Sequence, residues 1–266
     1  GWQQHPAIDL LQAGLEVEVL RHSERAEPLL QRLLALPLTD DLYGSARLLQ
    51  VIVSFHFDQI SAVSEQLPQL PVLPKPLWAG FRLVEAGQLM LTGALPQARN
   101  QLEWVIGWAD CQYQFHTKLA ACYRLAQLYF FQGDWELCRK SAQLALQVAA
   151  TQGMTEDPLL DSTYRLLAEI ALQQGALDEA SHWLAHDPHR QTNEDRYHKL
   201  PWQALRCIQQ VWQGALQDLP EQLARLEQQR YSQQFCRLWQ FRTGYTLALG
   251  YQQCGRPEAL QRLLQR

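Results

Sequence analysis

Four side chains in the second half of the sequence have the spacing of metal ligands. Glu179, His182 and His186 follow one another at intervals of three and four residues, and His189 comes three residues later. Residues at i, i+3 and i+7 share one helix face, and two imidazoles one turn apart can chelate zinc. The alternative is a solvated helix end that runs into a polar loop. We favour this alternative, because neither a fourth ligand on the shared helix face nor a supporting partner is evident, and we expect no metal.

The usual motifs of catalysis and nucleotide binding are missing from the sequence. It contains no G-x-x-x-x-G-K-[ST], G-x-S-x-G or H-E-x-x-H run and no dinucleotide fingerprint. We also recognise no arrangement of a nucleophile with a base and no pair of catalytic carboxylates in the sequence. We therefore expect that the chain is not an enzyme and that it holds no cofactor.

Composition and charge exclude several classes of partner. The chain has 266 residues, 47% of them hydrophobic, and a formal net charge of −4, which leaves no basic footprint for direct contact with nucleic acid. No apolar run approaches the length of a membrane span, and no signal peptide is present. The six cysteines form no CxxC pair and sit in apolar helical patterns, which predicts reduced, buried thiols and a cytoplasmic location. Because the first residue is Gly1, we interpret the sequence as a fragment of a longer protein.

The elements that carry these residues are expected to be helices. Apolar residues recur at i, i+3, i+4 and i+7 along almost the whole chain, and β-branched residues are sparse. A glycine followed about five residues later by a small residue recurs, as at Gly93, Gly133 and Gly175, with degenerate copies elsewhere. These anchors fall at positions 21, 57, 93, 133, 175, 214 and 255. Such self-similarity indicates a solenoid, in which each hairpin buries its apolar face against its neighbours.

Seven helix hairpins follow from this register. A polar loop is expected at 187–199. The predicted helix pairs are 7–20 with 23–36, 40–57 with 59–67, 77–92 with 95–110, 113–132 with 134–152, 158–174 with 177–186, 200–213 with 218–230, and 233–253 with 256–265.

A proline-rich stretch at 67–76 interrupts the helical pattern. It holds four of the 13 prolines, so a helix cannot pass through it. It could mark a domain boundary, but the repeat spacing stays in step across it. We therefore expect an extended connection inside one domain that covers residues 1–266.

The best-preserved copy of the repeat lies between Leu119 and Leu146 and resembles the tetratricopeptide repeat. The signature positions are occupied by Leu125, Ala126, Tyr129, Gly133, Asp134, Cys138, Ala142 and Ala145. The resemblance implies an all-α, right-handed superhelix, or α-solenoid, of about seven hairpins. The Gln- and Leu-rich copies with a longer period, such as QQGALDEASHWL, resemble the sensor region of MalT-type regulators of the LuxR family. Those are ATP-dependent bacterial transcription activators.

The tetratricopeptide register also places candidate ligand-binding residues on a concave groove. Aromatic side chains there lie beside Arg, Glu and Gln, which suits a polar organic ligand or a peptide. The alternative is a generic polar surface with partly buried rings. The candidate groove residues are Tyr123, Gln127, Phe130, Phe131, Arg165, Glu169, Arg206, Arg242 and Tyr245. The register of the sixth hairpin, which carries Arg206, is less certain, and Trp202 and Trp212 are further candidates there.

The resemblance implies a domain that senses a ligand or partner for a bacterial transcription regulator. The expected partner is a protein, a peptide or a small effector such as a sugar, and self-association is a further option. The competing hypothesis is a constitutive scaffold that binds a peptide or partner helix in the same groove.

Overall fold

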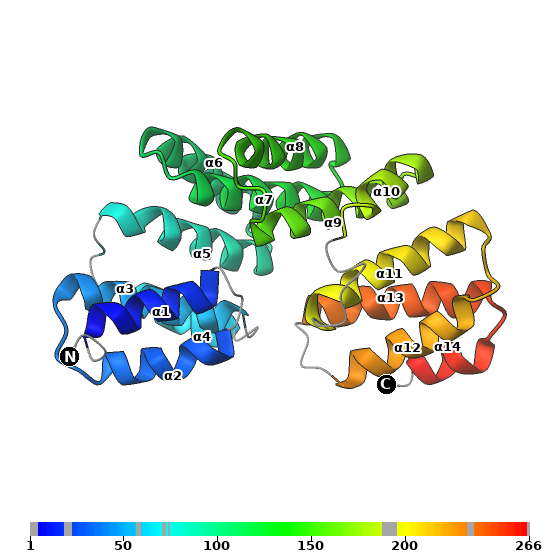
Figure 1. Cartoon of the computed structure of the whole chain (residues 1–266), viewed down its shortest axis with the longest axis horizontal. Coiled ribbons are helices and arrows are strands. Elements are labelled where there is room, and N and C mark those ends of the chain that lie inside the picture. Colours follow the sequence, from blue (N-terminus) through cyan, green and yellow to red (C-terminus); the bar gives the residue numbers. More distant parts are fainter. Residues whose placement is uncertain are drawn as a thin grey trace. The chain divides into compact units, whose positions relative to one another are not determined.

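The computed structural model is all-α in the part of the chain that it describes, as the periodicity predicts (Figure 1). The described residues are 5–18, 23–56, 60–70, 73, 75–187, 196–232 and 237–264. The chain divides into two compact units, residues 1–159 and 160–266. A single domain and a superhelix over the whole chain stay predictions.

Unit 1 contains four helix hairpins, which confirm the predicted pairs to within about two residues at most ends. Between the second and third hairpins, the proline-rich stretch forms two 3₁₀ turns, Leu67–Gln69 and Lys75–Leu77. The helices are α1 (Pro6–Glu18), α2 (Ser23–Leu34), α3 (Asp40–His56), α4 (Ile60–Gln66), α5 (Trp78–Leu91), α6 (Leu95–Cys111), α7 (Phe115–Gln132) and α8 (Trp135–Thr151).

Unit 2 contains the remaining three hairpins. Its helices are α9 (Pro158–Gln173), α10 (Leu177–Leu184), α11 (Arg196–Gln213), α12 (Leu219–Ser232), α13 (Arg237–Gln253) and α14 (Pro257–Leu264). The polar loop predicted at 187–199 is wrong at its end, because α11 already begins at Arg196. Pro201 lies inside α11, and because proline has no N–H it cannot donate the usual hydrogen bond to the carbonyl four residues earlier. The helix nevertheless includes the five residues before Pro201.

The turn between α7 and α8 confirms the predicted hairpin chemistry. Gly133 ends α7 in the left-handed conformation with φ of 75°, and the side chain of Asp134 accepts a hydrogen bond from Leu137 N at 3.1 Å. Cys138 is fully buried, and its Sγ donates to the carbonyl of Ala126 at 3.0 Å. The small residue five positions after glycine therefore brings the two helices together. The anchors at positions 21 and 57 lie outside the described residues.

Apolar clusters inside each unit hold the hairpins together. In unit 1, Ala13, Leu30 and Val53 join the first two hairpins, and in unit 2 Leu205 and Ile208 of α11 pack with α9 and α10. Such stacking supplies the burial that a single hairpin lacks.

The described cysteines are free thiols, but only some are buried as predicted. Burial raises the pKa of the Cys122 thiol to about 11 and that of Cys207 to about 12, so both stay protonated. Cys111 is exposed, because it sits on the outer side of the last turn of α6. Cys236 lies outside the described residues.

Candidate functional site

The exposed face of α7 brings together four of the predicted groove residues. Its opposite face is buried, with Ala121 and Leu128 fully inaccessible and Leu125 8% exposed. On the exposed side, Gln127 Nε2 donates a hydrogen bond of 2.9 Å to the hydroxyl oxygen of Tyr123, one turn earlier. Both side chains are half-buried, so the pair is pre-ordered and still reachable from solvent.

The two phenylalanines of α7 have different surroundings. Phe131 is 45% exposed, and its ring meets Phe130 edge-on with the centroids 6.2 Å apart. Phe130 is half-buried and also contacts Trp135 of α8 edge-on at 5.3 Å. Such edge-to-face contacts orient a ring. Phe130 therefore joins the two helices of the hairpin and supports Phe131, which offers the accessible apolar surface.

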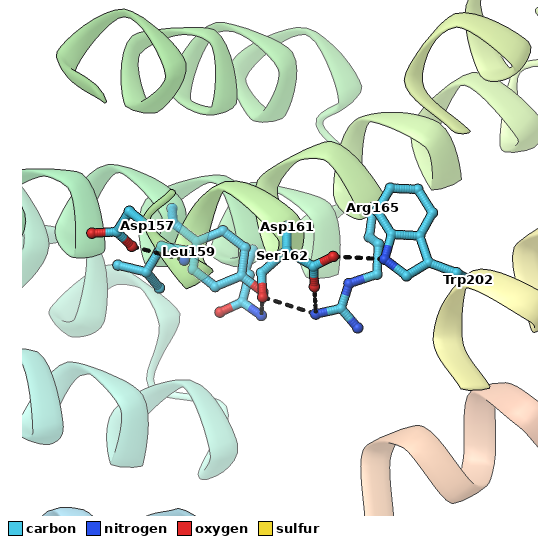
Figure 2. Close-up of polar contacts among 8 residues, drawn as sticks. Asp157, Leu159, Asp161, Ser162, Arg165 and Trp202 are labelled. Atoms are coloured by element: carbon cyan, nitrogen blue, oxygen red, sulfur yellow. Dashed lines mark hydrogen bonds and ion pairs between the residues drawn. The ribbon is translucent and has the colours of Figure 1, made fainter. Parts of the chain in front are cut away.

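Arg165 of α9 lies in a buried polar network and is only 7% exposed. Its guanidinium is 3.1 Å from Asp161 Oδ2 and donates to Ser162 Oγ at 2.9 Å. Asp161 also accepts a hydrogen bond of 2.6 Å from Trp202 Nε1 of α11, as Figure 2 shows. Trp202 is fully buried in the core of unit 2. In this arrangement the Asp161 carboxylate links α9 to α11, and the guanidinium of Arg165 holds that carboxylate in place.

A second arginine of unit 2 has a similar internal partner. Arg206 of α11 forms an ion pair of 2.7 Å with Asp187, whose side chain is 3% exposed. Glu169 is half-buried on α9, and Tyr245 of α13 is 49% exposed. The side chain of Arg242 lies outside the described residues.

The partners of these arginines were missed by the sequence prediction. Asp161 stands four residues before Arg165, the spacing of a helical ion pair, so that signal was available. Asp187 and Arg206 belong to separate elements, and their pairing had no local signal.

The histidines with metal-like spacing form a stack of rings. His186 lies parallel to Tyr164 with the ring centroids 4.2 Å apart, and His182 meets it edge-on at 5.4 Å. Burial, and after it the nearby His182, lowers the pKa of His186. The carboxylate of Glu179 accepts a hydrogen bond from Trp183 Nε1 at 3.3 Å. Across the described part of the chain, no three His, Cys, Asp or Glu side chains gather as metal ligands, and His189 is not among the described residues.

A comparison with known protein families locates helical repeats in the sequence. The tetratricopeptide repeat family matches residues 118–186. On both sides of this match, the described part of the chain continues in further helix hairpins. No curated protein is significantly similar to it in sequence.

Two solved structures share the fold. The crystal structure of NprR in complex with its cognate peptide NprX aligns with a TM-score of 0.69 and 15% identity, over 98% of this chain and 75% of that chain. The apo form of the quorum sensor NprR from B. thuringiensis gives a TM-score of 0.68 and 15% identity, over 97% and 73% of the two chains. In the described residues, no helix is long and apolar enough to cross a membrane.

Proposed function

We propose that this chain is the ligand-sensing domain of a bacterial transcription regulator and that it binds a peptide on the exposed face of α7. The observation that carries the proposal is the ordered pair of Tyr123 and Gln127 beside the accessible ring of Phe131. The amide of Gln127 offers both a donor and an acceptor to a peptide backbone, and the two rings offer surface for an apolar side chain.

Likeness to other proteins supports the same class of ligand. A solved structure of similar fold is a complex of NprR with its cognate peptide. The match of residues 118–186 to tetratricopeptide repeats includes all of α7 except its first turn. An open helical face suits an extended peptide better than a sugar, which proteins usually enclose in a concave pocket.

The sensing mechanism follows from the stacked repeats. Peptide binding would favour whichever conformation of the hairpins holds the peptide more tightly, and the effector modules would respond to that shift. In a MalT-type protein these modules would be a nucleotide-binding domain and a helix-turn-helix. The presence of both in the full-length gene product would support the regulator, whereas flanking catalytic modules would contradict it.

The alternative is a constitutive scaffold whose partner helix occupies the same face. The two functions differ in what the ligand changes. For a sensor, the peptide alters the DNA binding or ATPase activity of the full-length protein, whereas for a scaffold it only adds a partner.

The experiment starts from peptides selected against the whole chain from a random library. A selected peptide at about a hundredfold excess over its Kd should raise the free energy of unfolding by about 2.7 kcal/mol. In a chain of this size, that corresponds to a rise of about 5–10 °C in the melting temperature. If no peptide changes the melting temperature while sugars or other metabolites do, the peptide proposal is wrong.

A further inference from the structure

A second surface of unit 1 exposes tryptophan side chains next to the proline-rich connection. It is formed by Trp78 and Arg82 of α5 and by Trp104 and Trp108 of α6, and these four residues are called the tryptophan face. Trp78 is 42% and Trp104 is 40% exposed. Tryptophan is usually largely covered in a folded protein, so two such rings on one hairpin point to a surface with a partner.

Contacts between α5 and α6 show that these side chains lie on the same side of the hairpin. The guanidinium of Arg82 lies 5.7 Å from the ring centroid of Trp104 and donates to Gln101 Oε1 at 2.7 Å. Trp104 and Trp108 stack with their centroids 5.9 Å apart. Because the helices run antiparallel, Trp78, one turn before Arg82, is level with Trp108, one turn after Trp104.

The short helix α4 contacts only part of α5. It has seven residues, whereas the second helices of the neighbouring hairpins, α2 and α6, have 12 and 17. Gln88 Nε2 donates to Ser64 Oγ at 2.8 Å, so α4 reaches the C-terminal half of α5. At the N-terminal half, Leu73 of the proline-rich connection packs in the cluster that contains Leu67 and Val84.

The connection already makes one contact with the tryptophan face. Trp78 Nε1 donates a hydrogen bond of 2.8 Å to the carbonyl of Leu73, the residue that precedes Pro74 in the sequence. An indole N–H bonded to the carbonyl before a proline is a contact that an aromatic-lined groove can repeat with any proline-rich segment.

The other two tryptophans of the face, Trp104 and Trp108, also offer N–H donors. Within the described residues, the indole N–H groups of Trp104 and Trp108 form no hydrogen bond with the protein. The acceptors nearby, Glu85 and Gln101, are both bonded to Arg82. The face therefore offers apolar rings and N–H donors. A proline-rich segment is the matching ligand, because it is apolar, rich in carbonyl acceptors and poor in N–H groups.

We propose that the tryptophan face binds an extended, proline-rich segment of a partner protein. The segment would lie beside the connection at 67–76 and continue the contact that Trp78 makes with Leu73. Proline rings would pack on Trp104 and Trp108, and carbonyls of the segment would accept from their indole N–H groups. The segment is preordered as polyproline II, so little conformational entropy is lost on binding.

The test uses the whole chain and a labelled peptide of about twelve residues built from Pro-Pro-Leu repeats. Fluorescence anisotropy should show saturable binding, and replacing each proline by alanine should weaken it at least about tenfold. Trp104→Ala should weaken binding of the proline peptide by about tenfold or more. Trp212→Ala removes a ring that is 54% exposed in unit 2 and should leave the Kd unchanged. Equal binding of the two peptides, or equal loss in the two variants, would overturn the proposal.

A measurement on the unmodified protein guards against misfolding of the variant. With ¹⁵N-labelled tryptophan, the proline peptide should shift the indole resonances of Trp104 and Trp108 and leave that of Trp212 in place. Unshifted resonances at Trp104 and Trp108 would contradict the proposal. A dimer in sedimentation that Trp104→Ala dissolves would instead assign the face to a second copy of the chain. Because Tyr123→Ala leaves the tryptophan face intact, it should bind the proline peptide normally, which separates this inference from the proposed sensing function.

Discussion

The first helices of two consecutive hairpins, α7 and α9, carry groove candidates with very different surroundings. On α7, Tyr123 and Gln127 bond to each other and stay accessible. On α9, Arg165 is buried and bonded to Asp161 and Ser162, and Asp161 reaches Trp202 of α11. The same repeat position is therefore accessible to solvent in one hairpin and part of the internal structure of a unit in the other. The two cases differ in burial, because the Arg165 side chain is buried whereas the Tyr123 side chain is half-buried.

The largest effect is expected from Asp161→Ala. Removing this carboxylate takes away the ion pair between Asp161 and the buried guanidinium of Arg165 and the acceptor of Trp202 Nε1. Breaking a buried pair on one side costs about 3–5 kcal/mol. Urea unfolding of the variant should show this loss. A loss below about 1 kcal/mol would mean that the α9 network is as accessible as the α7 face.

Asp187→Ala should have the next largest effect. The Asp187 carboxylate is nearly inaccessible, but Arg206 is 32% exposed and water can solvate it once the partner is gone. We expect a loss of about 2 kcal/mol in the free energy of unfolding, measured in the same way. Glu27→Ala removes an exposed carboxylate within α2, is the matched control and should change stability by less than about 0.5 kcal/mol.

The turn that positions the α7 face can be tested with Gly133→Ala. A Cβ at this position would meet no atom within 4 Å, so the cost is only that of a left-handed backbone, about 1–2 kcal/mol. Thermal unfolding should show the loss. Gly107→Ala is the control, because this glycine is exposed within α6 and a Cβ there also meets nothing; alanine should be neutral or stabilising. Equal effects of the two changes would contradict the assigned role of the turn.

The smallest effect on stability is expected from pH. Burial lowers the pKa of His186 below its ordinary value of 6.5 in the folded state. The unfolded chain therefore takes up this proton first as pH falls. The contribution of neutral His186 to the free energy of unfolding is fully present above about pH 6.5 and is lost as pH falls through the folded-state pKa of His186. The urea concentration at the unfolding midpoint should decrease when the pH is lowered from 7.5 to 5.5, and this decrease should be smaller in His186→Gln. An unchanged pH dependence in this variant would exclude His186 as the source.

The sequence predicted the hairpins well because their determinants are local. Glycine at the turn, Asp134 as a cap and apolar periodicity are all read within a few residues, and the helix ends follow from them. The site was harder to predict. Tyr123 and Phe131 are accessible because the neighbouring elements leave them uncovered. Arg165 is buried in a network that Trp202, 41 residues after Asp161, joins through its bond to Asp161. The exposure of Trp78 and Trp104 depends on which side chains the neighbouring elements cover, which a repeat register alone does not reveal.

The most direct test of the account is the binding of a selected peptide to two variants, one of α7 and one of α8. Tyr123→Ala combined with Gln127→Ala should lower stability by less than about 1 kcal/mol, because both side chains are half-buried. The same variant should weaken peptide binding by about tenfold or more in calorimetric titration. Gln143→Ala, at an exposed position of α8, should bind as the unchanged protein does. Full affinity in the Tyr123 and Gln127 variant would contradict the claim that the exposed face of α7 is the sensing site.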